Sequence, residues 1–414
     1  MMTAASLAML LSFTAFIPRD LIRTNLSESA DYLCDSELFG EMWEGFAPSR
    51  TDHYADSILL GIAWQYDSSH PFKSVMESSY YHRDDANENV NLQNAVRSAL
   101  PADQEYMRYW HGSILLVRPL LMIMSVRGIY ILSAAILSAL FLVLLIILFR
   151  SGDRISAVGM ILGTVLTFSF FVPFSLEYTW VYLIMLTASV VVCLSCESIR
   201  SLSIVLMVCG IFTAFMDFLT AETLTLTVPL LLGIRKLSRK GVSERDLMKG
   251  SAGSALSWGV GYAGEMCLKW LLASMALGIN AMDYVAANLH ERTGGLVLSE
   301  DYFSFFGPVR ANCKCLAPFC FRTIGIVAGV IILLGCAYIG YVYRSASARG
   351  RVAVIYALIA LIPFIRFLVL RNHSVIHYFF TFRALMAVVL SITLMMGELL
   401  QNAQMGEILP KPKR

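Results

Sequence analysis

Four stretches of this sequence contain no charged residue over a length that would cross a lipid bilayer. They are residues 129–149, 155–176, 178–196 and 323–343. A helix needs about 20 apolar residues to span the hydrocarbon core. A backbone in lipid must satisfy its own hydrogen bonds, and these runs lack the alternation of a barrel strand. We therefore predict an all-α integral membrane protein.

The composition supports this prediction and excludes other classes. Hydrophobic residues make up 57% of the 414 residues and charged residues only 15%, whereas soluble chains average about 25% charged. The formal net charge is +2, so nothing indicates a basic surface for nucleic acid. We expect membrane lipids, and no nucleic acid, among the partners.

Weaker apolar segments raise the predicted number of spans to about ten. Residues 3–17 are expected to form a short, uncleaved first helix, since no basic residue precedes them and no small-residue cleavage site follows. The other candidates are shortened or interrupted by a charge, and they are 201–219, 222–234, 252–275, 352–370 and 383–400.

The positive-inside rule orients this multi-pass chain in a cell membrane. With the N-terminus in the cytoplasm, five short inner segments hold 15 Lys and Arg, and one of the five is the cytoplasmic tail 401–414. The bundle is expected to cover 129–400. The long segments 18–128 and 276–322 then lie outside, because long loops are exempt from the rule.

The first outer segment, 18–128, is predicted to be folded. It contains Trp43, Trp64 and Trp110, which is too aromatic for a solvated linker. Apolar residues at helical spacing predict a helix over 57–64 that lies on the membrane or on the bundle. Residues 113–126 predict an interfacial or re-entrant half-helix. A folded segment of this size indicates that something is handled at the outer surface.

The stretch TDHYADSILLGIAWQYDSSHPFKS at 51–74 is similar to the Asp-Glu-x-x-Tyr-Ala segment of aminoarabinose and mannosyl transferases. Those enzymes belong to the GT-C superfamily of polyprenyl-phosphate-dependent glycosyltransferases. The chain also resembles that superfamily in its predicted first helix, long extracytoplasmic loop and multi-helix bundle. His53 replaces the second acidic residue of the motif, and the later family signatures are absent.

Three further stretches resemble segments of uncharacterised polytopic membrane proteins of Gram-positive bacteria. These are YMRYWHGSILLVRPLL at 106–121, SWGVGYAGEMCLKW at 257–270 and NHSVIHYFFTFRA at 372–384. This resemblance covers most of the chain and implies no activity.

The resemblance implies a catalytic carboxylate in the outer segment. Asp52 and Asp56 would share one face of a helix, close enough for each to raise the other's proton affinity. By the resemblance Asp52 is expected to be the general base, with Asp56 as the alternative. A purely structural role also fits, because Thr51 and Asp52 stand where a helix begins and would cap it.

Basic residues near the C-terminus form the second candidate cluster. A short outer loop that merely connects two helices should contain few of them, yet this one holds Arg371, His373, His377 and Arg383, with Arg366 about one turn below. Guanidinium groups match phosphate oxygens bidentately, so a lipid phosphate is the expected guest. The same residues could instead anchor to lipid headgroups, or the two histidines could share a metal.

Charged residues near or inside predicted spans form a third group. Asp217 and Glu222 could hold an acceptor or a divalent cation, and Glu265 and Lys269 have the spacing of an ion pair. Arg108, His111 and Arg118 could complete the site or anchor the half-helix. No resident cofactor or metal is expected beyond such a cation.

Cysteines and short motifs add little. Cys34, Cys313, Cys315 and Cys320 lie in predicted outer segments, where an oxidising compartment could pair them. No phosphate-binding loop, dinucleotide fingerprint, nucleophile elbow or zinc ribbon is present.

These observations predict a GT-C-like glycosyltransferase that moves a sugar from a polyprenyl-phosphate donor to a cell-envelope glycan or lipid. Two alternatives remain open: a transporter or flippase for an anionic lipid-linked substrate, and a structural or assembly subunit. The transferase hypothesis requires Asp52 and Asp56 to meet the Arg371 to Arg383 segment across one cavity.

Overall fold

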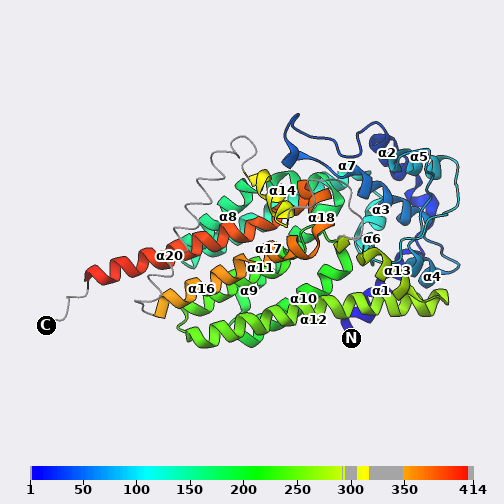
Figure 1. Ribbon diagram of the computed structural model, residues 1–414. Helices are drawn as coiled ribbons and strands as arrows, with labels where there is room; N and C mark the ends of the chain where they lie inside the picture. Colours follow the sequence, from blue (N-terminus) through cyan, green and yellow to red (C-terminus); the bar gives the residue numbers. More distant parts are fainter. Residues whose placement is uncertain (1, 291, 294–304, 317–347, 409–414) are drawn as a thin grey trace.

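The computed structural model describes residues 2–290, 292–293, 305–316 and 348–408 (Figure 1). Within these ranges the chain is helical, and its extended pairing is limited to two isolated bridges, Glu41 with Arg50 and Tyr80 with Gln104. This confirms the all-α prediction. The predicted span 323–343 lies outside the described residues.

Short helices make up the N-terminal part of the chain. They are α1 (Met2–Thr14), α2 (Arg19–Cys34), η1 (Ala47–Ser49), α3 (His53–Gln65), α4 (Pro71–Glu77), α5 (Glu88–Arg97) and α6 (Ile114–Leu120). The predicted half-helix 113–126 corresponds to α6, which contains Pro119, and to the turn that follows it.

The longer helices form the bundle. They are α7 (Val126–Arg150), α8 (Arg154–Leu166), η2 (Ser169–Phe174), α9 (Leu176–Ser195), α10 (Ile199–Met216), α11 (Leu224–Arg239), α12 (Glu244–Leu277), α16 (Ala348–Ala360), α17 (Ile362–Val369) and α20 (Met386–Ile408). Shorter helices flank them, namely α13 (Ala281–His290), α14 (Gly307–Leu316), α18 (Arg371–Ile376), α19 (Tyr378–Thr381) and η5 (Phe382–Leu385).

Five of the described helical segments are long and apolar enough to cross a membrane. They are α7, α9, α10, Arg351–Val369 and Tyr378–Glu398. The number rises to six if α1 and α2, which are bent by 85° at their junction, count as one broken span. This is fewer than the ten predicted, partly because α8 has only 13 residues and α11 only 16. The apolar helices support an integral membrane protein.

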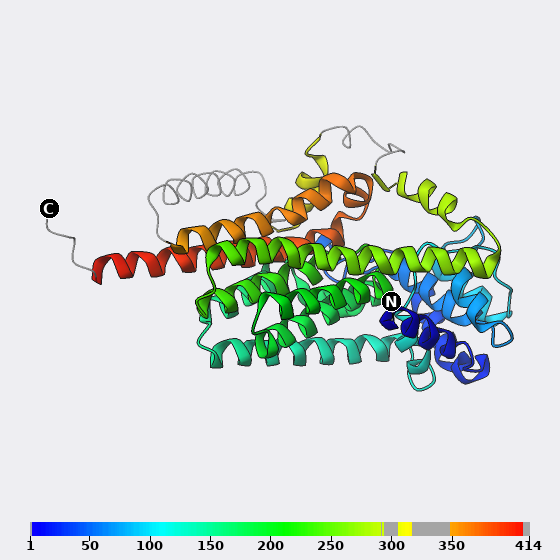
Figure 2. The same cartoon turned by 90° about the horizontal axis from the view of Figure 1, so that it is seen from below.

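The molecule has two regions joined by α12. Figures 1 and 2 show the long helices side by side at one end and the small helices α2 to α6 gathered at the other. The 34-residue helix α12 runs along both regions in Figure 2. It packs on α10 and α11 in the bundle and on α4 among the small helices.

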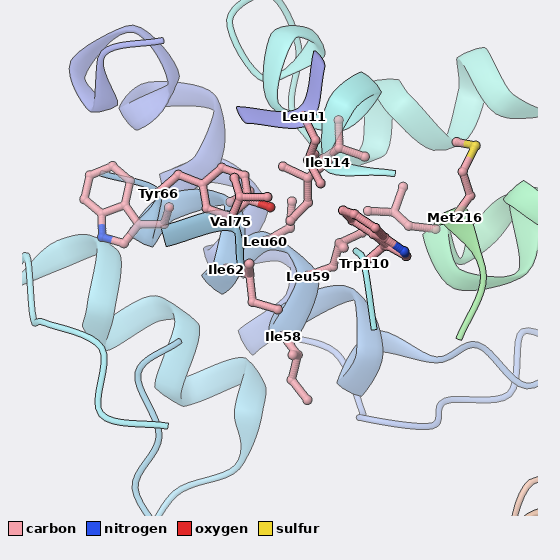
Figure 3. Packing of buried hydrophobic residues seen from close by; sticks show 14 of the residues in the cluster. Leu11, Ile58, Leu59, Leu60, Ile62, Tyr66, Val75, Trp110, Ile114 and Met216 are labelled. Atoms are coloured by element: carbon pink, nitrogen blue, oxygen red, sulfur yellow. The ribbon is translucent and has the colours of Figure 1, made fainter. Parts of the chain in front are cut away.

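Helix α3 forms the centre of the small-helix region rather than its surface. Ile58 to Trp64 are all buried, and α2, α5, α6 and α9 surround the helix. Figure 3 shows Leu59, Leu60 and Ile62 packed with Trp110 and Ile114. The helix predicted over 57–64 is confirmed as part of α3, but its predicted surface position was wrong: the residues between its apolar positions, Leu60 and Gly61, are also buried.

Glycines allow α10 and α12 to approach closely. A Cβ atom on Gly210 would collide with the backbone of Trp258, and one on Gly261 would collide with the carbonyl oxygen of Met207. Small residues at such contacts are typical of helix pairs in membranes. Gly259, on the same helix as Gly261, has nothing within 4 Å of its added Cβ.

We expect Gly261→Ala to destabilise the protein by about 1–3 kcal/mol, because the methyl group must push two backbones apart. The matched control Gly259→Ala should be neutral or slightly stabilising, since alanine favours helix over glycine at an open position. Thermal melting of both purified variants in detergent measures the difference. Equal melting temperatures would contradict this account of the contact.

Candidate functional site

A small cavity lies where the small-helix region meets the bundle. It encloses about 60 Å³, enough for a few water molecules. Its polar and charged lining comes from α3, the loop before α6, α9, the segment after α13, and α18. The lining residues are Asp52, Tyr54, Ala55, Ile58, Leu59, Tyr106, His111, Glu177, Phe218, Arg292, His373, His377 and Phe380. The cavity therefore joins Asp52 to two histidines of the predicted basic cluster.

Asp52 occupies the N-cap of α3. Its Oδ1 accepts a hydrogen bond of 2.9 Å from the Ala55 backbone N–H, and its own N–H donates to the Ser175 hydroxyl at 2.9 Å. The capping role considered from the sequence is thus confirmed. The side chain also lines the cavity and is 2% exposed, so capping does not exclude a role in chemistry.

The Asp52 carboxyl group lies close to that of Glu177, at the start of α9, and both line the cavity. Two neighbouring carboxyl groups favour a proton on one of the two. Burial raises the pKa of Asp52 to about 6, against the opposing effects of the Ala55 N–H and Glu177. A carboxylate that titrates near neutral pH is suited to accept a proton.

Asp56 lies one turn further along α3 than Asp52. It accepts hydrogen bonds from the Tyr130 hydroxyl and from the backbone N–H groups of Leu176 at 2.9 Å and Glu177 at 3.4 Å. Burial, together with the neighbouring Asp52 charge, raises its pKa to about 8. One half of the predicted mutual effect is therefore present: Asp52 raises the pKa of Asp56, whereas the pKa of Asp52 is shifted by burial, Ala55 and Glu177. Asp56 is fully buried and is not among the residues that line the cavity.

Three histidines line the opposite wall as neutral groups. Burial lowers the pKa values of His111 and His377 to about 3 and also lowers that of His373, whose pKa nearby Arg366 lowers further. They can therefore donate and accept hydrogen bonds but do not supply the positive charge expected from the sequence. The Nδ1 atoms of His111 and His377 are buried, with no hydrogen-bond partner in the part of the chain that the structure describes.

The backbone at His111 is held in an unusual conformation. Its φ angle is +53°, in the left-handed region that non-glycine residues rarely adopt. The next residue, Gly112, donates a backbone hydrogen bond of 2.9 Å to the Phe215 carbonyl oxygen, and a Cβ there would collide with Phe215. This contact fixes the loop to the end of α10 and directs His111 to the cavity.

Arg292 supplies the positive charge. Its Nη1 lies 3.4 Å from His377 Nε2, and no ion pair to a carboxylate involves Arg292 within the described part of the chain. Arg292 also lines a second hollow of about 260 Å³, an apolar groove between α12 and α13. Its other lining residues are Arg108, Tyr109, Leu219, Tyr262, Ala263, Met266, Cys267, Trp270, Val285, Asn288, Leu289 and Leu370. Cavity and groove meet at Arg292.

The region beside the cavity contains Arg366, Asp217 and Glu222, which bind protein groups and do not line the cavity. Arg366 pairs with Glu222 at 2.9 Å and contacts His373 Nδ1 at 3.3 Å. Asp217 accepts hydrogen bonds from the backbone of Leu219 at 2.9 Å and from Thr220. These carboxylates already have partners, so the predicted acceptor or cation site at Asp217 and Glu222 is not formed.

The other predicted arginines lie away from the cavity. Arg383 donates to the carbonyl oxygen of Pro48 at 3.0 Å and lies over the Tyr178 ring, while Arg371 lies 6.0 Å from the centre of the Phe305 ring. Neither lines the cavity, because the helical turns of α18 to η5 point them elsewhere. The juxtaposition that the hypothesis required is therefore formed only in part: Asp52 shares the cavity with His373 and His377, whereas Asp56, Arg371 and Arg383 do not line it.

Arg108 and Arg118 have separate roles. Arg108 lines the groove, where it stacks 4.2 Å from the centre of the Tyr106 ring and donates to Asn288 at 2.7 Å. Arg118 is buried and donates to the carbonyl oxygens of Ala63 and Ile17. The anchoring interpretation of Arg118 is thus the correct one.

The predicted ion pair between Glu265 and Lys269 is absent. Lys269 instead donates to the carbonyl oxygens of Val75 at 3.0 Å and Met76 at 2.9 Å, at the C-terminal end of α4. Those carbonyls lie at the negative end of the helix dipole, which explains why the Lys269 ammonium group binds them. The Glu265 carboxylate oxygens have no hydrogen-bond partner among the described residues.

Cysteine pairing and metal binding receive no support from the described residues. Cys34, Cys313 and Cys315 are free thiols, and Cys320 lies outside the described ranges. The part of the chain that is described contains no group of three or more His, Cys, Asp or Glu side chains arranged to hold a metal.

The sequence reasoning missed two of the residues that define the cavity. Glu177 is the single charge between two predicted spans, at 155–176 and 178–196, and a lone carboxylate in such a context is itself a signal of function. Arg292 stands in a long outer segment with no local pattern to mark it.

A comparison with protein-family models, curated proteins and solved structures found no match.

Proposed function

We propose that this protein is a membrane glycosyltransferase that moves a sugar from a polyprenyl-phosphate donor to a cell-envelope acceptor. One observation carries the proposal: a buried carboxylate pair lines the same cavity as the Arg292 guanidinium, which has no ion pair among the described residues, and an apolar groove leads away from it. A base, an anion site and a lipid path are the elements that such a reaction requires.

In the proposed reaction Asp52 accepts the proton of the acceptor hydroxyl. The acceptor oxygen then forms a bond to the anomeric carbon of the sugar, while the bond between that carbon and the phosphate oxygen breaks. The phosphate leaves with the electron pair. Arg292 would stabilise its charge, and the neutral His377 beside it would donate or accept a hydrogen bond.

The groove between α12 and α13 is the better of two paths for a lipid phosphate. The other apolar hollow, about 390 Å³ between α6, α7 and α9, contains no charged residue or histidine in its lining. The α12 to α13 groove contains Arg108 and Arg292 among apolar side chains such as Met266 and Leu289. An isoprenoid tail in this groove would place its phosphate beside Arg292.

We place the cavity on the outer side of the cytoplasmic membrane, with both chain termini inside and a GT-C-like arrangement of about ten spans. The distribution of Lys and Arg in the short loops supports this orientation. The cavity holds only about 60 Å³, so donor binding requires Arg292 and the histidines to move apart.

Proteoliposomes test the proposal. Incubation with labelled undecaprenyl-phosphate sugars and cell-envelope extracts should yield labelled acceptor. Movement of the intact lipid between leaflets without transfer would favour a flippase. If neither sugar transfer nor lipid movement is detected, a structural subunit is favoured.

The anion site can be tested by binding alone. We expect Arg292→Ala to weaken the binding of undecaprenyl phosphate about ten- to a hundredfold, the loss of one charge-assisted interaction, without affecting undecaprenol. Arg310→Ala is the matched control, because Arg310 is exposed on α14 and lines neither hollow. Native mass spectrometry in detergent measures both lipids. Equal losses for phosphate and alcohol would contradict the role of Arg292.

A further inference from the structure

A second polar hollow lies on the other side of the segment that carries Asp52. It has a volume of about 550 Å³ and is lined by Tyr32, Ser36, Glu37, Phe39, Gly40, Glu41, Met42, Glu44, Arg50, Thr51, His53 and Phe174. We call it the acidic basin. Thr51 and His53 line the basin, whereas Asp52 between them lines the cavity. One stretch of backbone therefore separates the two hollows.

The basin and the cavity differ in charge. Three glutamates line the basin, and its one arginine, Arg50, is paired with Glu41 at 2.8 Å. Among the described residues no ion pair involves Glu37 or Glu44. An anionic ligand would be repelled here, whereas the cavity offers Arg292 to an anion.

Aromatic rings and one unsatisfied polar atom give the basin its binding chemistry. Tyr32, Phe39 and Phe174 line it together with the carboxylates, a combination that suits the faces and hydroxyl groups of a saccharide. His53 is 6% exposed, and its Nδ1 lies 3.2 Å from the Glu37 carbonyl oxygen. Its Nε2 has no hydrogen-bond partner among the described residues, and leaving a buried polar group unpaired is costly.

We propose that the acidic basin binds a saccharide portion of the acceptor that carries no negative charge, being either neutral or amino-bearing. The inference rests on the proposed function, because it assigns the basin to the acceptor of that same reaction. The carboxylates of Glu37 and Glu44 accept hydroxyl or ammonium hydrogens, and His53 Nε2 pairs with a further hydroxyl. The stacked rings of Phe39 and Tyr54, 5.8 Å apart, continue the wall between basin and cavity.

Direct binding of defined tetrasaccharides tests the basin. Full-length protein in nanodiscs is titrated with neutral chitotetraose, its cationic de-N-acetylated form and anionic tetragalacturonate. We expect the first two to bind and the third to bind at least tenfold more weakly. Equal binding of all three, or tightest binding of the anionic sugar, would overturn the assignment.

Variants separate the basin from the catalytic cavity. His53→Ala should weaken chitotetraose binding about tenfold, whereas the control His70→Ala, at an exposed position before α4, should not. Glu44→Gln, at an exposed position that cannot disturb folding, should weaken the cationic sugar more than the neutral one. Unchanged binding in both His53→Ala and Glu44→Gln would overturn the assignment.

Asp52→Asn distinguishes this inference from the proposed function. It should leave saccharide binding unchanged, because Asp52 faces the other hollow. Saccharide binding without sugar transfer in any preparation would refute the transferase proposal but not the assignment of the basin as a saccharide site. Transfer without saccharide binding would refute the basin alone.

Discussion

Replacement of Asp52 by asparagine is expected to reduce the rate of sugar transfer about 10²- to 10⁴-fold, the usual contribution of a general base. Asparagine cannot accept the proton of the acceptor hydroxyl. Its side-chain oxygen can still accept the Ala55 N–H hydrogen bond that caps α3. The loss should therefore appear in kcat, with unchanged expression and melting temperature.

The pH dependence identifies the group. The pKa of Asp52 is raised to about 6 by burial, so the carboxyl group is largely protonated at pH 5 and largely ionised at pH 7. Transfer by the wild-type protein should rise as the pH increases through about 6, and this rise should be absent in Asp52→Asn. A raised pKa also means that burial disfavours the ionised form, so the neutral amide does not reduce stability at pH 7.

Asp85→Asn is the matched control, since Asp85 is an exposed carboxylate in the same outer segment. It should retain wild-type rates and pH dependence. A wild-type rate in Asp52→Asn would remove Asp52 as the base, and a pH profile that persists in that variant would assign the titration to another group.

The helical class and the membrane character could be predicted because they depend on local composition. Charge-free runs such as 129–149 leave a backbone in lipid no alternative to a helix. The cap formed by Asp52 and the half-helix at Pro119 are likewise local signals, which depend on residue type and on a few neighbours in the chain.

The composition of the site could be predicted only in part, because it depends on distant contacts. Asp52 and His377 were both singled out, yet the cavity that joins them depends on how α18 turns. The partners of Lys269 and Arg366 illustrate the difficulty. Lys269 donates hydrogen bonds to carbonyl oxygens at a helix end and does not pair with Glu265, and Arg366 forms an ion pair with Glu222 instead of facing the cavity. Sequence spacing identifies which pairs can form but not which competing partner is closer in the fold.

A buried ionic cluster at the far end of the bundle should dominate stability. Arg235 on α11 lies 3.4 Å from Asp153 and pairs with Glu398 on α20, and all three side chains are buried. Asp153 follows α7, whereas Tyr130 near the start of α7 contacts Asp56. At 1.5 Å per residue, α7 separates the cluster from the cavity that contains Asp52 by about 30 Å.

We expect Arg235→Met to destabilise the protein by about 3–5 kcal/mol, because among the described residues it leaves the buried Glu398 without a cation and Asp153 with only the partly exposed Arg239 at 3.8 Å. Arg239→Met is the matched control: Arg239 is 38% exposed and lies 3.8 Å from Asp153, so its loss should cost less than about 1 kcal/mol. Adding Asp153→Asn and Glu398→Gln to Arg235→Met should recover part of the stability, since the uncompensated charges are then gone. If the melting temperature does not recover, the effect is due to lost packing of the Arg235 side chain. Because the cluster is so far from the cavity, Arg235→Met should lower the melting temperature without changing the pH dependence of transfer.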